Sequence, residues 1–289
     1  KEGNDAYRRG VQALRDAAKH IKRPRLEHVE VPYGATSLPA IFVHAEPANT
    51  HGKVPAMVFF DGLDITKEIQ YFKGVADLAA RGIACLIVDG PGNGESIRFR
   101  DLYLRHDTEH YATPVFDYLS SRPEVDPRRI GVMAISLGGY YAPRAAAFEK
   151  RFACCIAWGA QWDYQKIWRD RFERLAKADT PSLSVAAQHI SWVFNVKTQD
   201  EVLKALEPFK LDGVVQKIAC PFLMVHGEGD EQIPLAEARK CFDAVGSRQK
   251  TFKLFTRDEG GYHHCQIDNQ SICSAYMWDW LEQVLQPAR

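Results

Sequence analysis

The sequence predicts an α/β fold, in which a mostly parallel sheet is flanked by helices. Beyond His44, strand-like and helix-like runs alternate to about Trp158, as they do when crossover helices connect parallel strands. The next strand-like run, Phe222 to His226, follows only after a long interval that reads as helices. A chain of 289 residues can bury a full core of this kind, so one domain with an insertion accounts for its length.

The first elements are a helix and a pair of strands. A polar-faced helical pattern over Tyr7 to Lys19 ends at Arg23-Pro24-Arg25, and we expect residues 1–25 to be the remnant of an N-terminal helical region. Polar and apolar residues alternate over Glu27 to Val31 and over Ala40 to His44, which is typical of antiparallel strands.

The helical interval interrupts the core in sequence. We expect residues 26–158 and 219–289 to form the core, and residues 159–218 to form a helical cap inserted over it. Within the cap the pattern predicts three helices, over Tyr164 to Ala178, Ser182 to Phe194 and Asp200 to Phe209.

A serine stands at a predicted turn from strand to helix. The apolar run Arg129 to Ile135 leads into Ser136, and an Ala-rich helical segment follows from Tyr141 to Glu149. Ala134 and Gly138 stand two positions before and after the serine, where strand and helix pack too closely for larger side chains. This pattern indicates a nucleophile elbow, which exposes a serine hydroxyl in a strained turn, with alanine in place of the usual first glycine.

A serine becomes a nucleophile only with a base and a group that orients the base. The candidate acid is Asp230, which lies in a Gly-bounded loop directly after the run Phe222 to His226. Glu228 and Glu231 are neighbours that could take its place. A solvated acidic loop without a catalytic role is the structural alternative.

The candidate base is a histidine in the Gly-rich loop from Glu259 to Gln266. This loop follows the strand-like run Thr251 to Phe255 and precedes a terminal helix from about Ser271 to Leu285. His263 and His264 are adjacent and cannot both point inward. We favour His264, with His263 at the surface or supporting the site. The order serine, acid, histidine along the chain is that of the α/β-hydrolase fold.

An oxyanion hole needs two backbone N–H groups. We expect one from Leu137, directly after the serine, and one from Leu63, in the loop after the buried run Val54 to Phe60. Asp61 and Asp64 flank Leu63, and we expect both to contact the substrate.

A second Gly-rich turn, Gly90 to Ser96, follows the buried run Ile83 to Val88, and this fold has such turns beside its active site. Gly92-Asn93-Gly94 within it could suggest a phosphate-binding loop. The turn lacks the Lys-Ser/Thr of a P-loop and the G-x-G-x-x-G spacing of a dinucleotide site, so we do not expect nucleotide binding.

The predicted cap is rich in aromatic side chains: Trp162, Tyr164, Trp168, Phe172, Trp192 and Phe194. At helical spacing such residues are more often core than pocket. The functional alternative is an apolar roof over a ring-bearing substrate, and to this roof we assign Trp162, Tyr164, Trp168 and Trp192.

Composition excludes several classes of partner. Lys+Arg and Asp+Glu both number 37, which gives no electrostatic reason to expect nucleic acid or an anionic membrane surface. The apolar runs are too short to span a bilayer. Seven cysteines show neither C-x-x-C nor zinc spacing. We therefore expect reduced thiols, no metal, no cofactor, a small-molecule substrate and a cytoplasmic protein.

The chain resembles a branch of the α/β-hydrolases over about Leu26 to Leu285. The segments that carry this resemblance are Asp61 to Glu68, Asp89 to Ser96, Ile135 to Ala142 and Gly260 to Gln266. The branch groups 2,6-dihydroxypseudo-oxynicotine hydrolase with the fungal polyketide chain-shortening hydrolases of the yellowish-green pigment type. The resemblance implies a metal-free serine hydrolase, which in some members cleaves a carbon–carbon bond next to a ketone. In the branch the histidine directly before Cys-Gln matches His264.

The resemblance also bears on the ends of the chain. Related enzymes carry a further helical region ahead of the core, which can complete the cap or a dimer contact. Because the chain starts at Lys1 without methionine, we expect residues to have preceded it, and the intact protein can be a homodimer.

These residues predict acyl transfer to water. Ser136 would attack a carbonyl, His264 would take its proton, and Asp230 would hold the imidazole. We expect a ring-bearing, polyketide-like ketone or aryl diketone that is cleaved at a carbon–carbon bond. A carboxylesterase acting on aryl or acyl esters is the alternative, because one triad serves both reactions. A non-catalytic binding protein on a hydrolase scaffold is the alternative from another class, and the intact set of triad residues argues against it.

Overall fold

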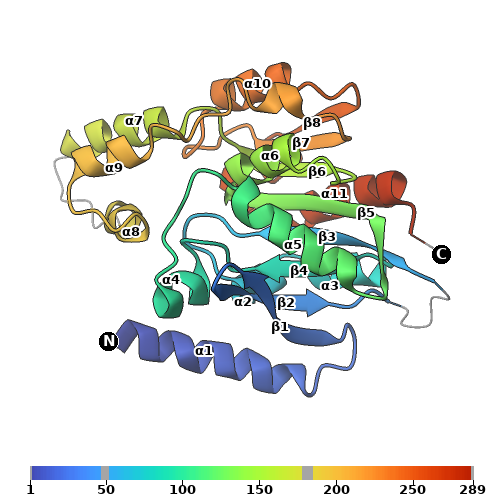
Figure 1. The fold of residues 1–289 in the computed structure, drawn as a ribbon. Coiled ribbons are helices and arrows are strands. Elements are labelled where there is room, and N and C mark those ends of the chain that lie inside the picture. The colour runs from blue at the N-terminus through green and yellow to red at the C-terminus, as the bar shows by residue number, and fades with distance from the viewer. Residues whose placement is uncertain (1, 47–51, 178–184, 288–289) are drawn as a thin grey trace.

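The fold is built on one mostly parallel sheet (Figure 1). The structure, a computed structural model, describes residues 2–46, 52–177 and 185–287 of the 289-residue chain. Its strands are β1 (Leu26–Tyr33), β2 (Thr36–Val43), β3 (Val54–Phe60), β4 (Ala84–Val88), β5 (Val125–Leu137), β6 (Cys155–Ala160), β7 (Phe222–Gly227) and β8 (Lys250–Phe255). They lie in the order β1-β2-β4-β3-β5-β6-β7-β8.

The direction of the strands matches the sequence pattern. β2 pairs antiparallel with β1 and with β4, as the alternating residues at the start of the chain predict. The other neighbouring strands are parallel. The predicted α/β-hydrolase fold is therefore confirmed. Because the parallel strands share a direction, their carboxyl ends meet at one edge, where loops can converge on a site.

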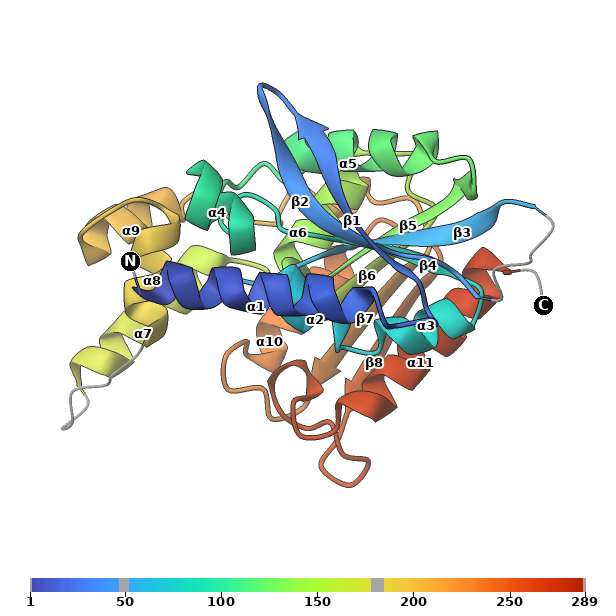
Figure 2. The same ribbon diagram turned by 90° about the horizontal axis from the view of Figure 1, so that it is seen from below.

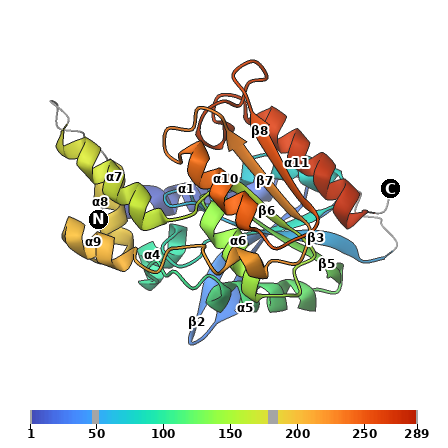
Figure 3. The ribbon, with the colours of Figure 1, turned by 90° about the horizontal axis from the view of Figure 1, so that it is seen from above.

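Helices cover both faces of the sheet (Figures 2 and 3). Met57 and Phe59 of β3 belong to the apolar cluster under α1, α3 and α11, whereas Val58 and Phe60 belong to the cluster under α5, α6 and α10. All four side chains are buried, as expected for a parallel strand that is covered on both faces. The helices are α1 (Glu2–Ala18), α3 (Val75–Ala80), α5 (Glu109–Ser121), α6 (Gly138–Phe148), α10 (Leu235–Ala244) and α11 (Gln270–Leu285).

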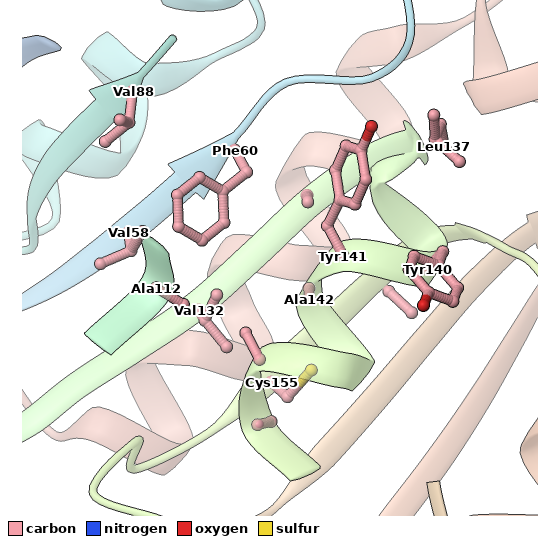
Figure 4. Close-up of a cluster of buried hydrophobic side chains, with 14 of the residues drawn as sticks. Val58, Phe60, Val88, Ala112, Val132, Leu137, Tyr140, Tyr141, Ala142 and Cys155 are labelled. Atoms are coloured by element: carbon pink, nitrogen blue, oxygen red, sulfur yellow. The ribbon is translucent and has the colours of Figure 1, made fainter. Parts of the chain in front are cut away.

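The core beneath α6 is densely aromatic (Figure 4). Tyr140 and Tyr141, in its first turn, are almost fully buried, and their rings lie edge to face with centroids 6.2 Å apart in the cluster that also holds Phe60 and Val132. Leu137, at the end of β5, is buried in the same cluster. This packing holds the turn between β5 and α6 in place.

A group of helices lies at one end of the sheet (Figure 1). These are α7 (Tyr164–Ala176), α8 (Val185–Val193) and α9 (Gln199–Ala205), and they stand in the interval between β6 and β7. The predicted helices agree with them except at their ends. Ala178 and Ser182 to Ser184, which the prediction included, lie outside the described residues.

The predicted end of the third cap helix, at Phe209, is wrong. The Phe209 carbonyl accepts the Tyr164 N–H at 3.0 Å, and the Leu211 N–H donates to the Trp162 carbonyl at 2.9 Å. The segments before α7 and after α9 thus pair with each other, and Asp163 and Lys210 form an isolated antiparallel bridge there, so the helix ends at Ala205 before this pairing begins. The Phe209 ring also packs on Tyr140 of α6, with centroids 5.0 Å apart.

Candidate active site

Ser136 lies at the junction of β5 and α6. Its φ is 60°, in the left-handed region that a residue with a side chain adopts only at a cost of about 1–3 kcal/mol. The backbone of the neighbouring loop lies very near it, since a Cβ on Gly62 would stand 2.9 Å from the Ile135 carbonyl oxygen and 3.1 Å from Ser136 Cβ. A Cβ on Gly138 would overlap that of Ala134. Small residues at these positions are therefore a steric requirement of the turn.

Ser136, His264 and Asp230 form a hydrogen-bonded chain. Ser136 Oγ lies 2.9 Å from His264 Nε2. His264 Nδ1 lies 2.7 Å from Asp230 Oδ2. The structure thus brings Ser136, at the carboxyl end of β5, together with Asp230 and His264, which follow β7 and β8, in the geometry of a nucleophile, an orienting acid and a base.

The Asp230 carboxylate is held by its own loop. Its Oδ1 accepts the backbone N–H groups of Gln232 at 2.8 Å and Ile233 at 2.9 Å, which leaves Oδ2 for the histidine. Burial alone would raise the pKa of Asp230, but the hydrogen bond and charge of His264 outweigh it and lower the pKa below its ordinary value. Glu228 and Glu231, the sequence alternatives, are exposed.

His264 is presented by a loop that a second carboxylate organises. Asp268 accepts the N–H groups of Gly261 at 3.0 Å, Tyr262 at 2.9 Å and His263 at 3.0 Å. The His263 side chain is exposed and its ring lies 5.2 Å from that of Tyr262. The sequence patterns did not point to Asp268. An aspartate that follows two glycines is nevertheless typical of a turn that the aspartate side chain stabilises.

The environment of His264 favours its charged form. Burial disfavours the imidazolium, but the Cys265 sulfur, 3.3 Å from Nε2, and the Asp230 carboxylate outweigh it and raise the pKa of His264. Cys265 itself has a left-handed backbone, with φ 51°. The Cys265 thiol and the Ser136 hydroxyl thus both contact His264 Nε2.

The loop after β3 approaches Ser136 from the other side. Leu63 lines the cavity next to the serine, and Leu137 follows the serine directly. Asn93 Nδ2 donates to the Gly62 carbonyl at 2.7 Å. From the cap, His189 Nε2 lies 2.9 Å from the Leu63 carbonyl oxygen. Asn93 and His189 thus contact the carbonyls of Gly62 and Leu63, which are the backbone carbonyls before and after the Leu63 N–H.

A cavity of about 50 Å³ opens beside Ser136 among the described residues. Of the residues predicted to contact substrate, Asp64 and Tyr164 line it. Its remaining lining residues are Leu63, Ser136, Gln161, Ile167, Arg171, Gln232, Ile233 and His264.

The other residues predicted to bind substrate do not line this cavity. Asp61 is 1% exposed beneath the loop, where burial and the negative charges of Asp89 and Glu68 raise its pKa well above the ordinary value. Trp168 is fully buried in the core. Packing surrounds both side chains in the structure, and their contact with the substrate stays a prediction.

Trp162 and Trp192 do not line this cavity either, and their contact with the substrate also stays a prediction. Trp162 packs against the main apolar cluster. Trp192 is 40% exposed, with its ring 5.3 Å from that of His189 and under the guanidinium of Arg98. The helical spacing of the cap aromatics thus indicates packing more than a roof.

Sequence analysis missed two polar residues of the cavity. Gln161 directly follows β6, and Ser136 stands at the carboxyl end of the neighbouring strand β5, so strand order could have indicated Gln161. Its Oε1 is buried without a hydrogen-bond partner among the described residues. Arg171 lies seven positions after Tyr164 and therefore on the same face of α7.

One cluster of carboxylates has the spacing of a cation site. Glu68, Asp89 and Glu95 converge within the described part of the chain. The Lys67 ammonium stands among them, 2.6 Å from Glu68 and 2.7 Å from each of Asp89 and Glu95. A protein cation therefore occupies the place that a metal would take, next to α2 (Lys67–Tyr71) and α4 (Gly94–Arg100).

A model of the prolyl oligopeptidase family matches residues 69–288, a range that includes Ser136, Asp230 and His264.

The chain belongs to the prolyl oligopeptidase family.

This family of α/β-hydrolases is hydrolytic, so the protein is a hydrolase. No helix among the described residues combines the length and apolar character needed to cross a membrane.

Individual relatives define the branch within the family. Hydrolase LUC6 of Fusarium sp is 32% identical, with 88% of this chain and 68% of LUC6 aligned. The 20-hydroxy-prefusarin hydrolase FUS2 of Gibberella moniliformis is 30% identical over 98% of this chain and 73% of its own. The crystal structure of 2,6-dihydroxy-pseudo-oxynicotine hydrolase superimposes with a TM-score of 0.79 at 30% identity, covering 95% of this chain and 72% of the other. The predicted resemblance to this branch is confirmed.

Proposed function

We propose that this prolyl oligopeptidase family member is a serine hydrolase that cleaves a carbon–carbon bond next to a ketone in a ring-bearing substrate. The observation that carries the proposal is the continuous hydrogen-bonded chain from Ser136 Oγ through His264 to Asp230, on a serine with φ 60°. A base in contact with the hydroxyl, oriented by a carboxylate in contact with that base, makes serine a competent nucleophile.

The reaction would proceed in two halves. His264 Nε2 accepts the Ser136 proton as Oγ attacks the carbonyl carbon, and Asp230 stabilises the imidazolium. The N–H groups of Leu63 and Leu137 would hold the oxyanion. His264 returns the proton to the leaving group, and water then releases the acyl group from Ser136 by the same steps in reverse.

The proposal that the enzyme cleaves a carbon–carbon bond rests on the relatives of this chain. Relatives of this chain are named as hydrolases of 20-hydroxy-prefusarin and of 2,6-dihydroxy-pseudo-oxynicotine. The branch resemblance implies carbon–carbon cleavage next to a ketone in some members. Tyr164, Ile167 and Ile233 give the cavity beside Ser136 apolar walls that suit the carbon skeleton of a ring-bearing ketone.

A panel of aryl β-diketones and matched aryl esters, with products identified by mass spectrometry, tests this function. The proposal expects a carboxylic acid and a methyl ketone from each diketone that is cleaved. Hydrolysis confined to the esters would make the protein a carboxylesterase. Failure of a fluorophosphonate probe to label Ser136, together with no turnover of either class, would favour a binding protein.

We also propose a cytoplasmic location. All seven cysteines are unpaired in the structure, and six of them are buried, which suits a reducing compartment. Recovery of the native protein in a secreted or periplasmic fraction would contradict this.

A further inference from the structure

Arg171 is a cation without a carboxylate partner beside the nucleophile. It lines the same cavity as Ser136 and His264. Its guanidinium stands 4.5 Å above the Trp168 ring, and Nη2 lies 3.5 Å from Gln232 Oε1. Among the residues that the structure describes, no carboxylate lies within ion-pair distance of it. The only acid that lines the cavity with it, Asp64, is exposed.

The position of Arg171 is fixed by buried packing. Trp168 is fully buried and gives the guanidinium a flat aromatic surface to stack on. Tyr164 and Ile167, which share its face of α7, are buried too. A guanidinium held in this way presents its N–H groups in a fixed fork, which suits an oxygen anion better than the flexible ammonium of a lysine.

Carbon–carbon cleavage needs a second site for negative charge. In the cleavage of an ester, the charge leaves on an oxygen that His264 protonates directly. In the cleavage of a 1,3-diketone, the electron pair of the broken bond leaves on carbon and is delocalised onto the oxygen of the second carbonyl. The oxyanion hole already holds the first carbonyl oxygen, so a separate donor must face the second.

We propose that Arg171 is this donor and that the enzyme takes 1,3-dicarbonyl substrates, with the second carbonyl oxygen bound to the guanidinium. The inference rests on the proposed function and names its substrate class. Ser136 Oγ bonds to the first carbonyl carbon while its proton passes to His264. The bond to the central carbon then breaks, and its electron pair forms an enolate whose oxygen is held by Arg171. His264 delivers the proton to the central carbon, which gives a neutral ketone, and water converts the acyl-enzyme to a carboxylic acid.

Benzoylacetone and phenyl acetate make a matched pair of substrates for the test. Attack at the acetyl carbonyl of either compound gives the same acetyl-enzyme, so the two differ only in the leaving group. The measured quantity is the ratio of kcat/KM for benzoylacetone to that for phenyl acetate, in the wild-type enzyme, Arg171→Gln, Arg171→Ala and Arg174→Gln. Arg174 lies on the same helix but does not line the cavity.

Loss of one preorganised donor to an oxyanion lowers kcat by about a hundredfold to a thousandfold. We therefore expect Arg171→Gln to lower the diketone-to-ester ratio at least about thirtyfold, through kcat more than KM, and Arg174→Gln to keep the ratio within about threefold. Millimolar guanidinium should restore part of the diketone turnover of Arg171→Ala, which a purely structural role would not allow.

The outcomes separate the two proposals. A wild-type enzyme that cleaves both compounds, with an unchanged ratio in Arg171→Gln or an equal fall in Arg174→Gln, overturns the role of Arg171 and leaves carbon–carbon cleavage standing. A wild-type enzyme that cleaves phenyl acetate and no diketone of the panel overturns carbon–carbon cleavage, and the substrate class with it.

Discussion

Asn93 Nδ2 donates a 2.7 Å hydrogen bond to the backbone carbonyl of Gly62, in a buried contact. The Gly62 carbonyl and the Leu63 N–H belong to one planar trans peptide group, so they point in opposite directions. Asn93 therefore fixes the orientation of the N–H that we propose as an oxyanion donor. A hydrogen bond to the carbonyl also polarises the peptide and strengthens its N–H as a donor.

Replacing Asn93 should weaken catalysis more than binding. We expect Asn93→Ala to lower kcat by about tenfold to a hundredfold with little change in KM, because the donor it orients acts on the transition state. An aryl boronic acid, which mimics the tetrahedral adduct, should lose affinity by a similar factor. Steady-state kinetics and inhibitor titration provide the measurement.

Ser96→Ala is the matched control for Asn93. Ser96 Oγ donates to the Asp89 carbonyl at 2.6 Å in the same turn, but it makes no contact with the Gly62–Leu63 peptide. Both variants lose one buried hydrogen bond and should lose similar stability. Equal losses of boronic-acid affinity in the two variants would show that Asn93 only supports the fold.

The two adjacent histidines should differ in importance. His264 contacts both Ser136 and Asp230, whereas His263 is exposed. We expect His264→Ala to lower kcat by at least about a thousandfold, since the general base is lost, and His263→Ala to lower it by less than about threefold. A reversed order of the two activities would assign the base to His263.

Cys265 should set the acid limb of the pH profile. His264 acts as a base only when neutral, so kcat/KM falls as the pH drops through its pKa. The Cys265 sulfur helps to raise that pKa, and its removal should lower it. In Cys265→Ala we therefore expect the acid limb of the profile of kcat/KM against pH to move to lower pH. Cys273→Ala, another buried thiol that is not in contact with His264, should leave the limb in place. If the acid limb of the Cys265→Ala profile stays in place, the Cys265 thiol does not raise the pKa of His264.

The ion pairs of the buried Lys67 should contribute strongly to the free energy of unfolding. Lys67 is 1% exposed, and its ammonium pairs with Glu68, Asp89 and Glu95 at distances of 2.6 to 2.7 Å. Lys67→Met removes this buried cation from among the three carboxylates, and we expect the free energy of unfolding to fall by about 3–5 kcal/mol. Lys166→Met, which breaks an exposed pair with Asp170, should cost less than about 1 kcal/mol. Urea unfolding measures both, and comparable losses would contradict the importance of burial.

The sequence was sufficient where chain order decides position. The carboxyl ends of β5, β7 and β8 meet at one edge of the sheet, so the turn at the end of β5 and the loops after β7 and β8 lie at this edge. This is why Ser136, Asp230 and the pair His263 and His264 could be named from the order of the strands and the motifs at their ends. The choice of His264 over His263 needed the resemblance to the branch, because the sequence pattern alone does not show which of two adjacent histidines points inward.

The sequence was insufficient where side-chain direction decides position. Tyr164, Trp168 and Arg171 all lie on α7, and only the packing of that helix sends Trp168 into the core while Arg171 reaches the cavity. Asn93 contacts Gly62 across two loops that are distant in sequence, and no local pattern encodes that contact. Pairing of the segment after α9 with the segment before α7 likewise overrode the helical pattern predicted up to Phe209.

The most direct test of the account is the covalent intermediate on Ser136. The wild-type enzyme turning over benzoylacetone is quenched in acid, digested and mapped by mass spectrometry, with Ser136→Ala treated in parallel. We predict an acetyl group on Ser136 of the wild-type enzyme, release of acetophenone, and a fall in turnover of at least about ten-thousandfold in Ser136→Ala. An acetyl group found instead on Cys265, or activity of Ser136→Ala within tenfold of the wild-type enzyme, would contradict the assignment of the nucleophile.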